Sequence, residues 1–210
     1  MKKIILITIV LATIYYLNPG YFSLSNTGAY DENGNPQVWI FTFNDCGKPC
    51  NNAISTLDER VNYTEFNVSE DSGMQQLKKV GKSNQFPLIL IGSKRILNSE
   101  RMTIISNLAE VMGDSVLTPS ERHVMQGHFY EDGSPAVIMY GASWCGYCKK
   151  MREYFEKNNI QYTELDAEGN AQDAYNILRG TGFPLIYVGY QRINGANINQ
   201  FEKVMRELNI

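Results

Sequence analysis

The chain contains two copies of one residue pattern, and this repeat limits the folds it can adopt more than any other feature. The matches are residues 36–40 with 135–139, Cys46 with Cys145, residues 63–65 with 162–164, and residues 86–89 with 183–186. The first three lie at an offset of 99 and the last at 97, so a single two-residue deletion aligns the copies. A unit of about 75–80 residues is too long for a solenoid repeat and is typical of a duplicated domain.

Within each copy, the apolar pattern predicts strands alternating with helices. In the second copy, we expect strands at residues 136–140, 161–165, 185–188 and 191–193, and helices at 146–158, 171–178 and 199–208. The clearest strands of the first copy are residues 38–43, 63–68 and 88–91. The order β-α-β-α-β-β-α predicts an α/β fold, in which each of two tandem domains has a mixed four-stranded sheet flanked by helices.

The ends of the repeat divide the chain into four parts. We predict an N-terminal hydrophobic helix at 1–25, a first domain at 30–113, a connector at 114–134 and a second domain at 135–210. The connector has no clean periodicity and contains several turn residues. Its two histidines, His123 and His128, are expected to be surface residues.

The N-terminus predicts export. Lys2 and Lys3 precede an uncharged, mostly apolar run at residues 4–17, which is typical of a signal peptide or an uncleaved signal anchor. A buried N-terminal strand or helix is the alternative. The lysines would stay in the cytoplasm, so the remaining chain is expected on the exported side, in a bacterium the periplasmic side, where thiols tend to be oxidised.

Composition excludes several classes of protein. A formal net charge of −3, from 19 Lys and Arg against 22 Asp and Glu, argues against a nucleic-acid-binding protein. A chain with 43% hydrophobic and 20% charged residues is too apolar to be disordered. Four cysteines are too few for a disulfide scaffold of 210 residues, and they form two tight pairs.

The second pair carries the strongest chemical signal. Cys145 and Cys148 follow an expected strand and open an expected helix, whose unpaired N–H groups and positive dipole end stabilise a thiolate. We expect Cys145 to be the exposed nucleophile and Cys148 the shielded resolving thiol. Lys149, Lys150 and Arg152 add positive charge along the outer face of the helix. Half of a zinc site or a structural disulfide are the alternatives. No metal is expected.

The second copy resembles a glutaredoxin, within the thioredoxin-like superfamily. The resemblance rests on residues 144–148 (Trp-Cys-Gly-Tyr-Cys), 182–184 (Gly-Phe-Pro) and the 189–197 stretch. It implies that Pro184 is a cis proline facing the cysteines and that the Phe183 backbone pairs with a bound peptide or glutathione. Tyr147 is implied to contact the same ligand.

The resemblance also bears on the reductant. It implies that Gly195, Ala196 and Asn197 hold a glutathione carboxylate at a helix N-terminus. Two residues depart from the family pattern, because Ala142 stands where a lysine is usual and Asn197 where an acidic residue is usual. The expected reductant is therefore either glutathione or a thioredoxin-type donor.

The first pair is spaced differently. Three residues separate Cys46 from Cys50, and Pro49 occupies the place of Cys148. Thiols at i and i+4 share one helix face, so a disulfide is feasible. Three hypotheses remain: a second redox pair, a degenerate copy that binds a substrate or partner, and a structural disulfide or metal ligand. Pro87 keeps the place of Pro184.

These observations predict a membrane-tethered, exported thiol–disulfide oxidoreductase with no bound cofactor. Its partners would be a disulfide-containing protein or a glutathione mixed disulfide, and an electron-donor thiol. A non-enzymatic scaffold with static disulfides is one alternative, and an iron–sulfur or zinc protein is another. Glu65 and Glu164, from the repeated Tyr-Thr-Glu, are expected to be solvent-exposed groups at strand ends.

Overall fold

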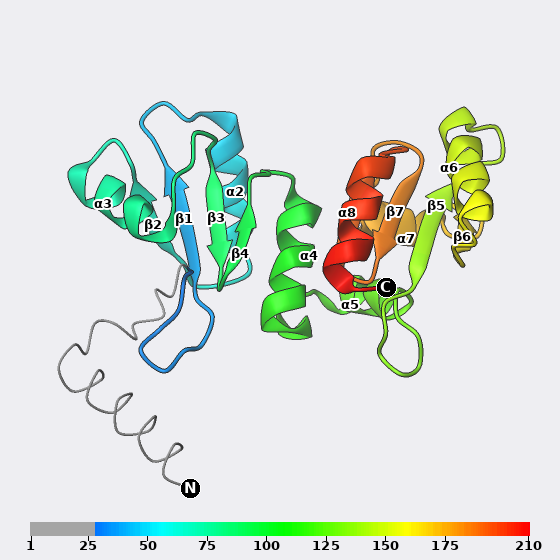
Figure 1. Ribbon diagram of the computed structural model, residues 1–210, viewed down its shortest axis with the longest axis horizontal. Coiled ribbons are helices and arrows are strands. Elements are labelled where there is room, and N and C mark those ends of the chain that lie inside the picture. The colour runs from blue at the N-terminus through cyan, green and yellow to red at the C-terminus, as the bar shows by residue number, and fades with distance from the viewer. Residues whose placement is uncertain (1–27) are drawn as a thin grey trace, which may run out of the picture.

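A computed structural model describes residues 28–210 of the chain (Figure 1). The hydrophobic helix predicted at 1–25 lies outside these residues. Among the helices of the described part, none combines the length and the apolar character that crossing a membrane requires.

The first domain has the predicted strand and helix order. Its elements are β1 (Val38–Thr42), α2 (Lys48–Asp58), β2 (Thr64–Asn67), α3 (Asp71–Val80), β3 (Leu88–Ile91), β4 (Lys94–Ile96) and α4 (Arg101–Met112). The sheet order is β2-β1-β3-β4, with β1 and β2 parallel and the other pairs antiparallel.

The second domain repeats this topology. Its elements are β5 (Val137–Gly141), α6 (Gly146–Lys157), β6 (Thr163–Asp166), α7 (Gln172–Ile177), β7 (Leu185–Val188), β8 (Gln191–Asn194) and α8 (Ile198–Leu208). The sheet order is β6-β5-β7-β8, again with one parallel pair. The prediction of two mixed four-stranded sheets with flanking helices is therefore confirmed.

The hydrophobic pattern explains how the layers pack. All four residues of β3 and of β7 are buried, as expected for inner strands covered on both faces. Helix α8 turns Phe201 and Val204 into the core, with Met205 and Leu208 packed against it, which confirms the face predicted for this helix. A polar outer face and an apolar inner stripe are what hold such a helix on a sheet.

The segment predicted as a connector is folded. It contains a 3-10 helix, η1 (Asp114–Val116), and the helix α5 (Pro119–Gln126). Helix α5 begins with a capping box, in which Thr118 and Glu121 each bind the other's backbone N–H. Such a box stabilises even a short helix that lacks an apolar repeat.

A hairpin follows α5, and an equivalent hairpin precedes β1 in the first domain. The backbone N–H of Ala136 donates to the His128 carbonyl, as that of Gln37 donates to the Ala29 carbonyl. The Gly189 N–H in turn donates to the Ala136 carbonyl, and the Gly92 N–H donates to the Gln37 carbonyl. Each hairpin is thereby bonded to the sheet of its own domain. The structural repeat therefore begins near residues 29 and 128, earlier than the strands of each copy.

The expectation that His128 is a surface residue is wrong. Its side chain is 1% exposed, because the hairpin places the ring 4.6 Å from that of Tyr187, centroid to centroid. The Nε2 atom lies 2.9 Å from the Tyr140 hydroxyl oxygen. Burial lowers the pKa of His128 to about 4. His123, on α5, is exposed as expected.

Helix α4 joins the two domains (Figure 1). It lies between the sheets and packs against β8, and its buried residues belong to a hydrophobic cluster that includes residues of both domains. Arg192 of β8 forms an ion pair with Glu100, which precedes α4, at 2.8 Å. Arg60 of the first domain holds Glu121 of α5 with two bonds, at 2.7 and 2.9 Å.

Candidate active site

The two cysteines of the second domain meet at the start of α6. Cys145 is the N-cap residue of this helix, and its Sγ atom accepts a hydrogen bond from the backbone N–H of Cys148 at 3.1 Å. The thiol of Cys145 therefore lies where the backbone donors and the dipole of the helix favour negative charge. Neither sulfur is in a disulfide.

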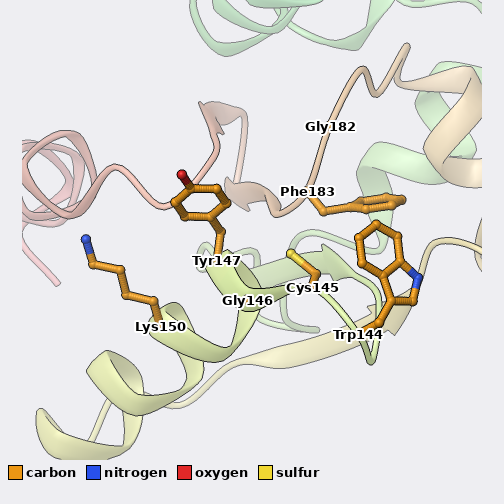
Figure 2. Close-up of a pocket in the computed structure, with 7 residues that line it drawn as sticks. All are labelled: Trp144, Cys145, Gly146, Tyr147, Lys150, Gly182 and Phe183. Carbon is orange, nitrogen blue, oxygen red and sulfur yellow. The ribbon is translucent and has the colours of Figure 1, made fainter.

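The expectation of an exposed Cys145 is wrong, whereas the shielded position expected for Cys148 is confirmed. Cys148 is 0% exposed, as expected of a shielded thiol, but Cys145 is only 5% exposed. Cys145 is covered because its sulfur lies on the floor of a pocket, between the side chains of Tyr147 and Trp144 (Figure 2). A ligand reaches it through this pocket and not from an open surface.

Burial dominates the chemistry of the resolving thiol. It raises the pKa of Cys148 to about 12, and the neighbouring Cys145 thiol acts in the same direction. A hydrogen bond from the Ala142 backbone and the positive charge of Arg152 both act against this rise. Cys148 is consequently held as a neutral thiol at neutral pH, and it must lose a proton before it can attack a disulfide.

The pocket is open and has mainly aromatic walls. Its volume is about 820 Å³, and its lining residues are Trp144, Cys145, Gly146, Tyr147, Lys150, Gly182 and Phe183. Trp144 and Tyr147 are 69% and 68% exposed, which is unusual for large aromatic side chains. Figure 2 shows Trp144 and Phe183 on one side of the Cys145 sulfur, with Tyr147 and Lys150 on the other.

The wall formed by Trp144 is held in place by specific contacts. The indole Nε1–H donates to Glu168 Oε2 at 2.7 Å, and the ring meets Phe183 edge to face at 5.9 Å. Phe183 packs in turn on Tyr175, whose hydroxyl donates to the Gly182 carbonyl at 3.0 Å. An exposed aromatic wall fixed in this way loses little conformational entropy when a ligand binds.

The predicted binding residues divide into two groups. Tyr147 and Phe183 line the pocket, and Pro184 lies buried next to Phe183 through a cis peptide bond. Residues 195–197 do not belong to the pocket lining. Asn197 is the N-cap residue of α8, and its side chain accepts a bond from the Gln200 backbone N–H at 3.1 Å.

Residue patterns alone did not identify all of the pocket lining. The predicted site lacks four lining residues, of which only Lys150 lies outside the quoted motifs; the others are Trp144, Gly146 and Gly182. Lys150 lies one helical turn after Tyr147, and this i, i+3 spacing on one face was the available signal.

Glu164 is exposed on β6, as expected, but Arg152 is half-buried and does not point away from the sheet. Arg152 was expected on the outer face of α6 and Glu164 at a solvent-exposed strand end. Arg152 forms a two-bonded ion pair with Glu164, from Nε to Oε2 at 2.8 Å and from Nη2 to Oε1 at 2.7 Å. Arg152 Nη2 also donates to the Ala142 carbonyl at 3.2 Å. The pair therefore joins α6 to β6 and to the loop before Cys145.

The cysteines of the first domain form a disulfide. Cys46 and Cys50 are linked with their Cα atoms 5.7 Å apart, at the start of α2. Cys50 is buried and Cys46 half-buried. The Phe86–Pro87 peptide bond is cis, like its counterpart in the second domain. Residues 28–210 contain no group of three or more His, Cys, Asp or Glu side chains that could hold a metal ion.

Two curated proteins illustrate the sequence similarity. A glutaredoxin from Pseudomonas aeruginosa is 23% identical over 66 residues, which cover 30% of this chain and 79% of that protein. Thioredoxin 3 from Plasmodium falciparum is 31% identical over 87 residues, which cover 35% of this chain and 48% of that protein. The chain thus spans about half the length of this thioredoxin.

Two solved thioredoxins each match part of the chain. One from Plasmodium falciparum has a TM-score of 0.30 at 25% identity, covering 35% of this chain and 70% of that one. Oxidised thioredoxin O1 from Arabidopsis thaliana has a TM-score of 0.32 at 20% identity, covering 40% and 86%. The glutaredoxin family model matches residues 38–96 and again residues 137–193, more than half of the chain. The chain belongs to the glutaredoxin family, and each of its two domains matches that family separately.

Proposed function

We propose that the chain is a thiol–disulfide oxidoreductase that uses Cys145 and Cys148 in a dithiol mechanism. The observation that supports this best is the position of the Cys145 sulfur. It lies at the N-terminus of α6, on the floor of an open aromatic pocket and one helical turn from a second thiol. The helix terminus favours the thiolate form, which is the nucleophile in disulfide exchange.

The reaction proceeds in two exchanges. The Cys145 thiolate attacks a substrate disulfide, so that a bond forms between Cys145 Sγ and one substrate sulfur while the other leaves as a thiolate. Cys148 then attacks Cys145 Sγ, releases the second substrate sulfur and forms the Cys145–Cys148 disulfide. The substrate gains two electrons, and an external dithiol or two molecules of glutathione restore the protein. In the reverse direction the same pair oxidises dithiols.

The proposed partners are disulfide-containing proteins or glutathione mixed disulfides, with glutathione or a thioredoxin-type protein as electron donor. A protein disulfide suits the pocket, because its aromatic walls present a large apolar contact surface beside Cys145. The Asn197 side chain caps its own helix, and Ala142 carries no charge that could bind a carboxylate. We place the reaction on the exported side of a membrane, on the basis of Lys2, Lys3 and the apolar run after them.

The test compares equivalent cysteines of the two domains. Cys145→Ser should lower the rate of insulin disulfide reduction at least about 1000-fold, because the nucleophile is removed. Cys46→Ser, at the matching position, should leave the rate within about twofold if only the second domain reacts. A Cys145→Ser protein with an unchanged rate would contradict the proposal. A Cys46→Ser protein with a large loss would support a second redox pair in the first domain.

A non-enzymatic scaffold with static disulfides is the second candidate. The half-buried Cys46–Cys50 disulfide of the first domain favours it for that domain. Equilibration with glutathione buffers, followed by alkylation and mass spectrometry, separates the two functions. A catalytic pair exchanges with the buffer, whereas a static disulfide stays oxidised across the physiological range of potentials.

A further inference from the structure

The last residue of β5 has no side chain, and this brings two reactive groups together. A Cβ atom on Gly141 would lie 2.9 Å from Glu164 Oε1 and 3.2 Å from Cys148 Sγ. The first contact is shorter than Cβ atoms make in proteins and the second is unusually tight, so a larger residue would displace the carboxylate and crowd the thiol. The carboxylate and the resolving thiol therefore approach the same small space from β6 and from α6.

Arg152 fixes the carboxylate at this place. Its two bonds hold both Glu164 oxygens, and its third bond to the Ala142 carbonyl anchors the guanidinium. The same residues border a small cavity of about 220 Å³ together with Gly141, Ser143 and Asp166. The Glu164 and Arg152 side chains are 27% and 30% exposed, so solvent reaches the ion pair.

The first domain provides an internal comparison. There Thr42 occupies the place of Gly141, and its hydroxyl donates to Glu65 Oε1 at 2.7 Å. The other two counterparts at the offset of 99 are Pro49 for Cys148 and Ala53 for Arg152. The carboxylate is thus present in both domains, but the open space, the arginine and the resolving thiol occur together in the second.

We propose that Glu164 accepts the proton that Cys148 loses when it attacks the mixed disulfide, and that Arg152 positions this carboxylate and stabilises the thiolate. The inference rests on the dithiol mechanism proposed above. Cys148 needs such assistance because burial raises its pKa. A positioned base typically accelerates a proton transfer by about 100- to 10,000-fold.

The step balances in atoms and electrons. The proton of the Cys148 thiol moves to the Glu164 carboxylate, directly or through one water molecule. The Cys148 thiolate then attacks Cys145 Sγ, the bond between Cys145 and the substrate sulfur breaks, and the substrate leaves as a thiolate. Two electrons pass to the substrate, and Glu164 returns the proton to the leaving thiolate or to solvent.

The other ionisable groups around Cys148 and the neighbouring cavity make different contacts. Cys145 is the sulfur under attack at this stage. Asp166 borders the same cavity, but its Oδ1 atom accepts the backbone N–H of Glu168 at 3.0 Å. Tyr175 donates its hydroxyl to the Gly182 carbonyl, and burial raises its pKa. Glu164 is distinguished by geometry, because its Oε1 atom and Cys148 Sγ lie beside the same Gly141 position.

The test follows both exchanges in the full chain by stopped flow, with a chromogenic peptide disulfide between pH 6 and pH 9. Glu164→Gln should form the mixed disulfide at the normal rate but resolve it roughly 100-fold more slowly at pH 7. Its resolution rate should rise about tenfold per pH unit, because hydroxide then replaces the missing base. Glu164→Asp should retain part of the rate. Glu65→Gln, the matched control in the first domain, should behave like the unchanged protein.

A second variant separates proton transfer from structure. Arg152→Met combined with Glu164→Gln removes both charges and leaves no unpaired guanidinium. Slow, strongly pH-dependent resolution in this double variant supports the proposal, whereas a return to the normal rate shows that Glu164 serves only to neutralise Arg152. Resolution in Glu164→Gln that matches Glu65→Gln at every pH would also overturn it. If neither the unchanged protein nor any of these variants forms a mixed disulfide, the dithiol mechanism itself fails.

Discussion

The two domains have the same scaffold and differ in the few residues that carry chemistry. Strand order, register, the cis proline and the first helix are shared. At the start of that helix, one domain has two free thiols beside a fixed tryptophan, and the other has a disulfide beside Asp45, with a φ of 62°. The comparison shows that packing of the sheet does not depend on the residues at the cysteine loop, so these could diverge without loss of the fold.

The domains also differ in their buried residues. The His128–Tyr140 pair of the second domain is replaced in the first by Ala29 and Phe41, which are equally buried. The first domain thus fills with apolar atoms a region that the second fills with a hydrogen-bonded polar pair. The stability that the apolar region gives the first domain should not depend on pH, whereas the stability that the polar pair gives the second domain should.

The largest expected difference concerns the resolving position. Cys148→Ser should stop turnover of protein disulfides, at least about 1000-fold, and leave the substrate attached to Cys145. Cys50→Ser should leave turnover within about twofold. Mass spectrometry of the trapped complex, beside the steady-state rate, measures both. An equal loss in the two variants would show that the domains act in series.

The next expected effect is a pH dependence of stability that comes from His128. Because its folded pKa is about 4 and its unfolded pKa about 6.5, protons bind the unfolded chain first as pH falls. The free energy of unfolding should therefore drop by about 3 kcal/mol between pH 7.5 and pH 4 through this group. Urea unfolding at several pH values measures it.

Two variants serve as controls for this effect, one at His128 itself and one at an exposed histidine. His128→Ala, which introduces the residue found at the matching position, should remove this component of the pH dependence. His123→Gln, at an exposed site, should leave it intact. A slope that survives in His128→Ala would assign the dependence to other groups.

A smaller effect is expected at the junction of the domains. Glu100→Gln leaves the buried guanidinium of Arg192 without its ion pair, so it should lower the free energy of unfolding by about 2 kcal/mol. Glu207→Gln, which breaks the exposed pair with Lys203, should cost less than about 0.5 kcal/mol. Two separate transitions in Glu100→Gln, in place of one, would show that this ion pair couples the domains.

The smallest effect is expected in substrate binding. Trp144→Ala should raise KM for a protein disulfide by roughly fivefold, because a fixed contact surface is lost, and leave kcat nearly unchanged. Phe43→Ala, an exposed aromatic packed on Phe86 in the first domain, should leave KM unchanged. A rise in KM for Phe43→Ala would place part of the substrate on the first domain.

Much of the fold was predictable because it depends on local patterns. The apolar runs at 88–91 and 185–188 and the repeat itself indicated both sheets correctly. Helix α5 was missed because its stability comes from the Thr118–Glu121 capping box, which leaves no apolar period. The repeated hairpin was missed although Gly-Asn-Pro at 34–36 matches Gly-Ser-Pro at 133–135.

The candidate site was predictable where neighbouring residues define it and not where distant residues meet. The positions of Cys145 and Cys148 at a helix start follow from their spacing. The contact between Arg152 and Glu164 depends on how α6 lies over β6, which no residue pattern specifies. The near-complete burial of Cys145 depends likewise on aromatic residues that approach it from both sides of the pocket.

Helix α4 has a consequence for how this duplication could be taken apart. By sequence it closes the first repeat, yet its buried side chains Ile104, Ile105 and Leu108 share one hydrophobic cluster with Tyr140, Leu185 and Tyr187. Cutting the chain after α4 would expose β8 in the C-terminal fragment. Cutting before α4 would expose the sheet of the first domain in the N-terminal fragment. The two halves are therefore duplicated domains that cannot be exchanged as independent modules. The core that they share sets the distance between their two cysteine sites.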